Sequence, residues 1–307
     1  RITLRVDLGE LAGAREVLES LSPAGSAQLI AAEAGLLMAE NRVEEALKLY
    51  TTLTSEAPQI AEHWLNLAAC QKALKQMVAP LHTLQQGYAL HPGRSNLAQG
   101  LGTLLADHGR WQEALPLLLA GAEASDARDV HHFNLQFAAA GARLLPAANL
   151  QQRAQAWEEH RQLQPSPLWA DHLRDRSPER RLRVAYLSQD FHNHPVGRFI
   201  EPVLELHNRE AVEVIGLSCG VIRDDVGERL RRHCDGWLDL RHGDDLACAR
   251  AIAELEADVV VELGGYTGGQ RLRLLTARPA PIQLSYLGYF ASTGLGCIDG
   301  WIGDRVL

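Results

Sequence analysis

Residues 182–199 read Leu-Arg-Val-Ala-Tyr-Leu-Ser-Gln-Asp-Phe-His-Asn-His-Pro-Val-Gly-Arg-Phe and decide the fold of the second half of the chain. Leu182 to Leu187 form a short, mostly apolar run, which is typical of a buried strand. A polar loop follows, and Pro195 then precedes a segment that reads as a helix over residues 198–206. The stretch therefore predicts a unit of strand, loop and helix.

The same alternation continues toward the end of the chain. Further segments follow in turn, with strands predicted over 212–218, 236–240, 258–263 and 282–287 and helices over 226–233, 244–256 and 270–277. A last strand-like segment precedes Asp304. Short apolar strands separated by helices predict right-handed crossovers and a parallel, doubly wound sheet. Ligands of such sheets bind beyond the carboxyl ends of the strands, so the loops after the strands are the candidate sites.

A repeat of about 34 residues organises the first half of the chain. Residues 42–47 and 110–115 match each other two periods apart, and Pro58 and Pro92 lie one period apart, each closing a helical segment. Small residues suit close crossings of antiparallel helices, and proline suits the end of a helix. The pattern resembles the tetratricopeptide repeat and predicts an α-solenoid, with complete repeats over residues 27–126.

The repeat pattern extends beyond this range and has two departures. Residues 9–18 read as the end of an earlier repeat, and residues 131–160 read as a further helical pair. Pro80 stands where the small crossing residue is expected, and Glu33 replaces an expected apolar residue. We expect distortion in the two helices that carry Pro80 and Glu33.

Asn66 and Asn134 are the candidate peptide-binding residues of the solenoid. They fall two periods apart at the same phase, and similar superhelices use asparagines on the concave face to hold the backbone of an extended peptide. Ala32 and Gly100 occupy the matching positions of the other repeats, so the ladder is interrupted. We expect protein or peptide partners along the concave face, with a solvated helix face as the alternative.

The length of the chain and a change in composition indicate two domains. A chain of 307 residues allows two domains comfortably. Residues 161–181 are polar and rich in proline, which is typical of a linker. The predicted organisation is a helical solenoid over 1–160, a linker over 161–181 and a sheet domain over 182–307.

Charge and cysteine content narrow the class of partner. Lys and Arg number 30 against 38 Asp and Glu, so the formal net charge of -8 argues against nucleic acid or an anionic membrane. No run approaches the ~18 apolar residues of a membrane-spanning helix.

The five cysteines include no C-x-x-C pair, so neither a disulfide framework nor a zinc site is predicted, and a reducing cytoplasm fits best. Because Arg1 is not a methionine and no leader follows it, we expect the chain to start inside a larger protein.

The loop after the first strand carries the titratable side chains. His192 and His194 flank Asn193 like a possible metal pair, but no third ligand completes a set at a known spacing. A histidine at the end of a strand suits hydrogen bonding to a substrate hydroxyl or phosphate, or the uptake of a proton. Asp190 can serve in catalysis or cap the following turn. The glycine-rich turn at 264–269 does not match a dinucleotide-binding motif and is weak evidence alone.

Four segments in this order carry a specific resemblance, namely 190–199, 265–267, 278–283 and 287–289. Together they look like the first catalytic half of the O-linked N-acetylglucosamine transferases, which are glycosyltransferase family 41. The resemblance implies an enzyme of the GT-B type, with two Rossmann-like halves, that inverts the sugar configuration without a metal or other cofactor. It implies transfer of N-acetylglucosamine from UDP-N-acetylglucosamine to Ser or Thr hydroxyls of proteins.

The resemblance also implies roles for single residues. His194 is the expected catalytic residue, as a base or as a positioning group, and Asp190 accompanies it. Leu287 and Gly288 correspond to residues that line the sugar pocket, where a Cβ at the glycine would push the sugar away. The full set of expected substrate-binding residues is Leu287, Gly288, Tyr289, Gly265, Tyr266 and Thr267.

Departures from the family pattern leave alternatives open. Phe290 stands where the family often has proline, so another nucleotide sugar or an Asn acceptor is an alternative. Gly236 precedes Trp237 where animal members have a histidine, which makes Asp235 a weak candidate base beside the reading of a solvated turn. The half that holds most of the uridine diphosphate is absent from these residues, so the chain alone is expected to be inactive. A non-enzymatic, peptide-binding scaffold is the remaining alternative.

Overall fold

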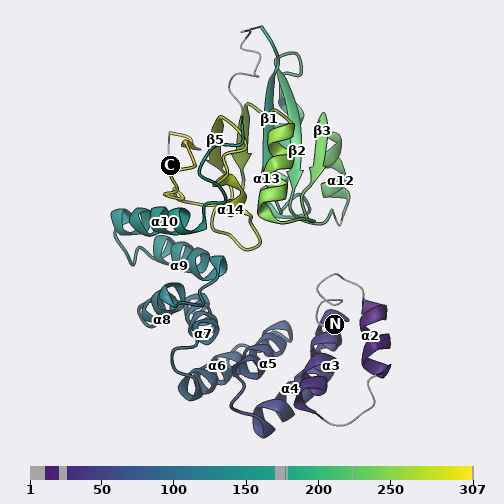
Figure 1. Ribbon diagram of the computed structural model, residues 1–307, viewed down its shortest axis with the longest axis vertical. Coiled ribbons are helices and arrows are strands. Elements are labelled where there is room, and N and C mark those ends of the chain that lie inside the picture. The colour runs from purple at the N-terminus through teal and green to yellow at the C-terminus, as the bar shows by residue number, and fades with distance from the viewer. Residues whose placement is uncertain (1–10, 21–25, 170–176, 178, 223, 306–307) are drawn as a thin grey trace. The chain divides into compact units, whose positions relative to one another are not determined.

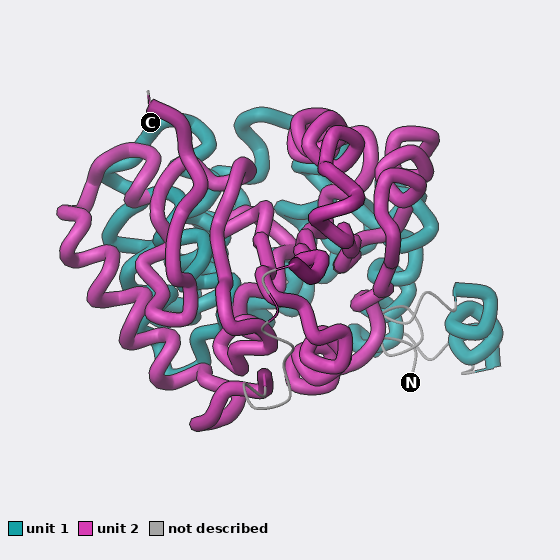
Figure 2. The backbone as a smooth tube through the Cα atoms, turned by 90° about the horizontal axis from the view of Figure 1, so that it is seen from above, with its two compact units in different colours: residues 1–138 teal, residues 139–307 magenta. Residues whose placement is uncertain are grey.

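The computed structural model describes residues 11–20, 26–169, 177, 179–222 and 224–305. The chain forms two compact units, residues 1–138 and residues 139–307, which are teal and magenta in Figure 2. Within the described residues, no helix combines the length and the apolar character needed to cross a membrane.

The first unit is a series of antiparallel helix pairs (Figure 1). Its helices are α2 (Leu11–Ser20), α3 (Ala27–Ala39), α4 (Val43–Glu56), α5 (Ala61–Ala73), α6 (Ala79–Leu90), α7 (Ser95–Asp107), α8 (Trp111–Glu123) and the larger part of α9 (Asp129–Gly141). The pairs α3–α4, α5–α6 and α7–α8 are in contact and form the predicted repeats. A Cβ added to Gly102 would lie 2.9 Å from Leu118, so this crossing needs glycine.

Pro80 and Glu33 do not distort their helices, so that expectation is wrong. Helix α6 begins at Ala79, which places Pro80 in the first turn, where its missing N–H has no helical partner to lose. Helix α3 runs unbroken from Ala27 to Ala39, and Glu33 is exposed on its surface.

The second unit holds a six-stranded sheet in which every paired strand is parallel, in the order β3-β2-β1-β4-β5-β6. Its elements are α10 (Ala147–Arg161), β1 (Leu182–Ser188), α11 (Pro195–Leu206), β2 (Val212–Ser218), α12 (Asp225–Arg232), β3 (Gly236–Asp239), α13 (Asp245–Glu254), β4 (Val259–Glu262), α14 (Leu272–Leu275), β5 (Ile282–Tyr286) and β6 (Gly300–Ile302). The predicted doubly wound sheet is confirmed. Helix α14 is shorter than the predicted 270–277, and α11 begins three residues earlier than predicted, directly after His194.

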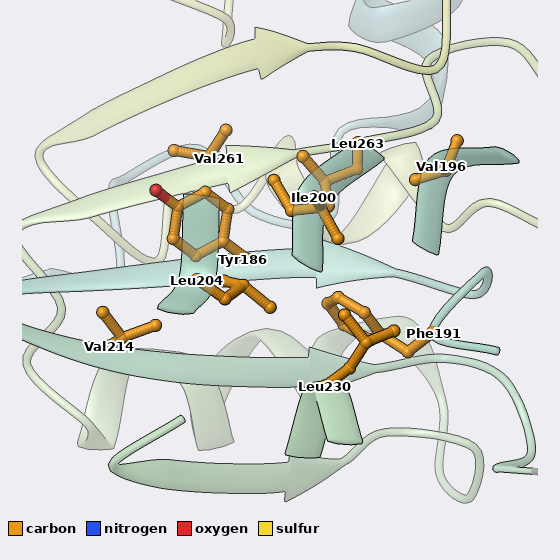
Figure 3. Close-up of a cluster of buried hydrophobic side chains, with 9 residues drawn as sticks. All are labelled: Tyr186, Phe191, Val196, Ile200, Leu204, Val214, Leu230, Val261 and Leu263. Carbon is orange, nitrogen blue, oxygen red and sulfur yellow. The ribbon is translucent and has the colours of Figure 1, made fainter. Parts of the chain in front are cut away.

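A buried apolar cluster fills the space between the sheet and helices α11 and α12. Figure 3 shows its members, which are Tyr186, Phe191, Val196, Ile200, Leu204, Val214, Leu230, Val261 and Leu263. Phe191 belongs to the loop after β1, and its ring lies beside Leu230 of α12. Burying a phenylalanine side chain contributes about 2 to 3 kcal/mol, so this contact fixes the loop that carries the predicted site.

The boundary between the compact units lies earlier than the predicted end of the solenoid at residue 160. Helix α10 belongs to the second unit, and the start of the predicted linker is also attached to that unit. Arg273 donates to the Arg161 carbonyl at 3.1 Å, and the Leu163 N–H donates to the Thr276 hydroxyl oxygen at 3.2 Å. These bonds hold α10 and the residues after it against α14.

Candidate active site at the carboxyl edge of the sheet

The predicted site residues meet at the point where the order of the strands reverses. Strand β1 lies between β2 and β4, so the chain leaves β1 toward one edge of the sheet and later returns to build the other edge from β4. The loops after β1 and β4 therefore diverge at the carboxyl edge, which is where doubly wound sheets bind ligands. Residues 189–194, 263–271 and 287–299 border this edge.

Asp190 is a buried carboxylate that joins two of these loops. Its side chain is 5% exposed, and its Oδ2 accepts a hydrogen bond from Gln270 Nε2 at 3.1 Å. Its backbone N–H donates to the Ser188 hydroxyl at 2.9 Å. The carboxylate thus holds the loop after β4 and does not cap the turn that follows it. Gln270 was missed from the sequence, because it lies 80 residues away along the chain.

His194 occupies the N-cap of α11, and its Nδ1 accepts the N–H of Val196 at 3.3 Å. The same Nδ1 lies 3.8 Å from Asp190 Oδ2, beyond hydrogen-bond distance, and the ring is 40% exposed. A neutral histidine whose Nδ1 accepts a hydrogen bond carries its proton on Nε2. In this geometry the part-exposed His194 side chain carries an Nε2–H donor at the carboxyl edge of the sheet.

The rest of the loop is anchored on helix α12. The Asn193 N–H donates to Asp224 Oδ2 at 2.8 Å, and Asp224 also caps α12 by accepting from the Gly227 N–H. The His192 and His194 rings lie 5.7 Å apart, centre to centre. Among the described residues, no group of three His, Cys, Asp or Glu side chains is arranged to hold a metal.

Glu262 organises the turn after β4 and was not predicted as a site residue. Its Oε2 accepts the backbone N–H groups of Gly264 at 3.0 Å and Gly265 at 2.6 Å, and the Ser285 hydroxyl donates to Oε1. Burial raises the pKa of this carboxyl, and the three hydrogen bonds oppose the rise. A single carboxylate at the end of the strand Val259–Glu262 is the sequence signal that could have identified it.

The predicted segment Gly265-Tyr266-Thr267 forms the turn itself. Gly265 has a φ of +54°, and a Cβ there would lie 2.5 Å from the Tyr289 Cβ. Tyr266 is 2% exposed, and its hydroxyl donates to the Thr293 carbonyl at 2.7 Å. The Thr267 hydroxyl donates to the Gly264 carbonyl at 2.8 Å. Tyr266 therefore packs in the protein interior, and the half-buried Thr267 lies nearer the surface.

The segment Leu287-Gly288-Tyr289 lies beside that turn. The Gly288 N–H donates to the Leu263 carbonyl at 3.0 Å, and a Cβ on Gly288 would collide with the same carbonyl oxygen. Glycine is thus required by the close approach of two backbones, whether or not a sugar binds there. Tyr289 is buried, and its ring meets Tyr266 edge-to-face at 5.5 Å. Phe290, 51% exposed, is the large side chain of this segment that faces the surface.

Helix α10 supports the loop that follows Phe290. The Gly296 N–H donates to Glu158 Oε2 at 2.5 Å. Gly294 has a φ of +69°, and a Cβ there would lie 3.1 Å from the Cα of Gln151. This contact between α10 and the loop was not predicted, because it joins segments that are far apart in the sequence.

Asp235, the weak candidate base, lies at the wrong edge of the sheet. It precedes the amino end of β3, whereas His194 follows the carboxyl end of β1 in a parallel sheet. Its carboxylate accepts from the Val214 N–H at 2.8 Å and from Arg209 at 2.9 Å. Asp235 is a structural ion-pair residue at the edge opposite His194.

Asn66 and Asn134 line one groove of the solenoid, together with residues of α7. The groove has a volume of about 460 Å³. Asn96 lies in the same groove and was missed, because it is out of phase with the other two. Its Oδ1 accepts hydrogen bonds from His131 at 3.0 Å and Arg128 at 3.1 Å, which ties α7 to the start of α9.

Comparison with known proteins finds relatives of the greater part of the second unit. Residues 160–307 match the family model described as Glycosyl transferase family 41. Over these residues the chain is similar to the glycosyltransferases of family 41. It is similar to a probable UDP-N-acetylglucosamine:peptide N-acetylglucosaminyltransferase, SEC, of Arabidopsis thaliana, with 34% identity over 127 residues, 41% of this chain and 13% of that protein. The UDP-N-acetylglucosamine:peptide N-acetylglucosaminyltransferase of Caenorhabditis elegans is 33% identical over 132 residues, 41% of this chain and 11% of that protein.

A solved structure extends the likeness to both units of the chain. An O-GlcNAc transferase mutant from Thermobaculum terrenum matches with a TM-score of 0.76 and 26% identity, covering 91% of this chain and 54% of that one. Helical repeats followed by a parallel sheet are therefore confirmed, as is the resemblance to O-linked N-acetylglucosamine transferases. The chain spans only a small part of the curated relatives' lengths, as the shares above show.

Proposed function

We propose that this chain is the acceptor-side half of a protein glycosyltransferase that moves N-acetylglucosamine from UDP-N-acetylglucosamine to Ser or Thr hydroxyls of proteins. One observation carries the proposal: His194 stands beside the buried Asp190 at the switch point of a family 41 sheet. The names of the Arabidopsis and Caenorhabditis relatives support the donor sugar and a polypeptide acceptor.

In the proposed reaction the acceptor oxygen forms a bond to the anomeric carbon, and the bond from that carbon to the diphosphate breaks. The diphosphate leaves with the electron pair and takes up the proton that the acceptor hydroxyl gives up. A single displacement inverts the sugar configuration. With Nδ1 accepting from Val196, a neutral His194 carries its proton on Nε2, so Nε2 is a hydrogen-bond donor and not an acceptor. We therefore assign His194 to orient the acceptor hydroxyl or the donor phosphate by donating a hydrogen bond.

The donor nucleotide belongs mainly to a second Rossmann-like half in this proposal. In the proposal the diphosphate lies over a helix N-terminus and beside a lysine of that half, groups that would stabilise negative charge without a metal. The residues of this chain supply the opposite wall, including Leu287, Gly288 and the turn at 265–267.

The proposed acceptor lies along the solenoid groove that Asn66 and Asn134 line. A cytoplasmic location is part of the proposal, because all five cysteines are free and a reducing compartment keeps them so. Nucleic acid and membrane partners are not proposed, because the formal net charge is -8.

A second candidate is transfer of a different sugar. Phe290 directly follows the expected sugar-pocket residues, is half exposed and lies 4.9 Å from Tyr289, ring centre to ring centre. A ring at that position reduces the room for an N-acetyl group. The Phe290 ring thus favours the nucleotide of a smaller sugar as the alternative donor.

Mass spectrometry of acceptor proteins tests both candidates. The protein carrying both Rossmann-like halves is incubated with UDP-N-acetylglucosamine and a cell extract, with and without a chelator. The proposal predicts an N-acetylhexosamine on Ser or Thr and no effect of the chelator. A hexose or deoxyhexose, obtained only with another donor, supports the second candidate. No modification with any nucleotide sugar would favour the scaffold alternative.

A further inference from the structure

The groove that Asn66 and Asn134 line also carries two cationic side chains. Lys72 of α5 and Arg128, directly before α9, line it together with Asn96 of α7. All five residues belong to the first unit, whose helices α5, α7 and α9 are labelled in Figure 1. Among the described residues that line the groove, none is an aspartate or a glutamate. The groove is therefore positively charged, although the formal net charge of the whole chain is -8.

The Arg128 guanidinium is held at the groove by Asn96. Its Nη2 donates to Asn96 Oδ1 at 3.1 Å, and His131 Nε2 lies 3.0 Å from the same oxygen. A guanidinium carries five N–H donors, so the bond to Asn96 leaves most of them for a ligand. Arg128 is an exposed residue, so a ligand can approach it without a rearrangement of the helices.

Lys72 supplies the second charge. Its side chain is 51% exposed, and its ammonium lies 3.9 Å from Oδ2 of Asp107, which is 57% exposed and does not line the groove. An ion pair this exposed contributes little, so the ammonium is able to turn toward an occupant. His131 adds no charge near pH 7, because burial and the Arg128 cation lower its pKa.

A carboxylate is the group that complements these donors. Arginine pairs with a carboxylate through two parallel hydrogen bonds, and a lysine ammonium adds attraction as a point charge. An uncharged side chain would leave both cations without a counter-ion, and a basic side chain would be repelled. The charge of the groove therefore selects an acidic occupant.

We propose that Lys72 and Arg128 make this groove a recognition site for aspartate or glutamate side chains of the bound polypeptide. The carboxylate bonds to the guanidinium of Arg128, and the ammonium of Lys72 attracts the same or a neighbouring acidic side chain. This inference rests on the proposed function only in requiring that the solenoid binds a polypeptide.

Peptide binding to the intact 307-residue chain tests the site. The probes are fluorescein-labelled Gly-Ser peptides with a central Glu-Glu, Gln-Gln or Lys-Lys pair, measured by fluorescence anisotropy at about 0.05 M salt. Glu and Gln have the same shape and differ in charge. We expect Glu-Glu to bind at least about fivefold more tightly than Gln-Gln, the scale of one exposed ion pair, and Lys-Lys to bind most weakly.

Two features make this order specific to the groove. The net charge of -8 attracts the Lys-Lys peptide to the chain as a whole, so a preference for Glu-Glu runs against the overall charge. The preference should also disappear at about 1 M salt, where exposed charges are screened beyond about 3 Å.

Variants locate the effect. Arg128→Gln and Lys72→Gln should each lower the affinity for Glu-Glu about threefold, and the double variant should lose the preference over Gln-Gln. The amide of Arg128→Gln can still donate to Asn96, which preserves the local structure. Arg94→Gln removes the same charge from an exposed position outside the groove, so it is the matched control and should bind as the parent does. Circular dichroism checks that each variant folds.

Equal binding of Glu-Glu and Gln-Gln by the parent chain, a preference for Lys-Lys, or binding of none of the peptides would overturn the proposal. A Glu-Glu preference that the double variant keeps, or that Arg94→Gln removes equally well, would overturn it too. The assay involves no sugar transfer, so failure of the recognition site leaves the proposed enzyme standing. Conversely, a Glu-Glu preference in a protein that transfers no sugar leaves the recognition site standing.

Discussion

Gln270 donates a hydrogen bond to Asp190, with 3.1 Å between Nε2 and Oδ2. This bond connects the loop after β1 with the loop after β4 across the switch point of the sheet. Asp190 Oδ2 lies 3.8 Å from Nδ1 of His194, whereas the Val196 N–H donates to that nitrogen at 3.3 Å. The carboxylate therefore supports the loops and does not orient the histidine as a base.

Replacing Asp190 by Asn tests this relationship. The Asn side chain keeps an oxygen for Gln270, so we predict that Asp190→Asn retains kcat within about fivefold in a protein with both halves. Where an aspartate does orient a catalytic histidine, as in serine protease triads, the same change costs about 10⁴ in kcat. A loss of that order in steady-state transfer kinetics would show that His194 is a base oriented by Asp190.

Gly288 and Gly268 form a matched pair for a stability measurement. A Cβ on Gly288 would collide with the Leu263 carbonyl, whereas a Cβ on Gly268 has no atom within 4 Å. We predict that Gly288→Ala lowers the free energy of unfolding by about 3 kcal/mol and that Gly268→Ala changes it by less than about 0.5 kcal/mol. Urea denaturation measures both. Equal stability of the two variants would mean that the backbones can separate at Gly288 without cost.

Glu158 is expected to hold the loop at 294–296 onto α10. Loss of a hydrogen bond to a charged group should speed amide exchange at Gly296 about tenfold in Glu158→Ala. Glu158→Gln keeps an acceptor and should exchange more slowly than the Ala variant, and Glu159→Ala, at the exposed neighbouring position, is the control. Unchanged exchange in Glu158→Ala, measured by hydrogen exchange, would contradict this role.

Glu262 should make stability depend on pH in a defined direction. Burial raises its pKa in the folded state above the ordinary value of 4.5, so the folded chain binds more protons than the unfolded chain in that range. The free energy of unfolding should fall as pH rises from about 4.5 toward the folded pKa, by at most about 1.4 kcal/mol per pH unit. Glu262→Gln cannot titrate but can still bond to Gly264 and Ser285.

The difference in the free energy of unfolding between wild type and Glu262→Gln isolates this contribution, because other groups titrate alike in both proteins. Urea denaturation at a series of pH values gives the free energy of unfolding of each protein as a function of pH. The two curves should converge or cross as pH rises. Parallel curves across that range would contradict the assigned pKa shift.

The sheet could be predicted because each strand is a short apolar run followed by a polar or glycine-rich loop. Residues Leu182 to Leu187 show the pattern most clearly. They pair in parallel with the apolar run of β2, from Leu182 opposite Val212 onward. Parallel strands place the loops after β1, β4 and β5 at one edge, which is why His194, Gly265 and Gly288 come together. The same rule excludes Asp235, since a residue before a strand lies at the opposite edge.

Contacts between distant segments could not be predicted. Helix α10 joins the second unit partly through the bond from Gly296 to Glu158, and neither residue has a periodic signal in the sequence. The bond from Gln270 to Asp190 is of the same kind. Gly288 could be predicted as a required glycine. The physical reason, which is the nearby Leu263 carbonyl, could not be predicted, because it depends on how the strands pack.

The most direct test of the account compares sugar transfer by two variants of His194 in the protein that carries both Rossmann-like halves. Loss of an active-site hydrogen-bond donor costs on the order of 10²-fold or more, so His194→Ala should lose at least that much. The amide of His194→Gln can still donate and should recover about tenfold of the loss. Wild-type transfer by His194→Ala would contradict the site, and a His194→Gln variant as inactive as His194→Ala would contradict the donor role.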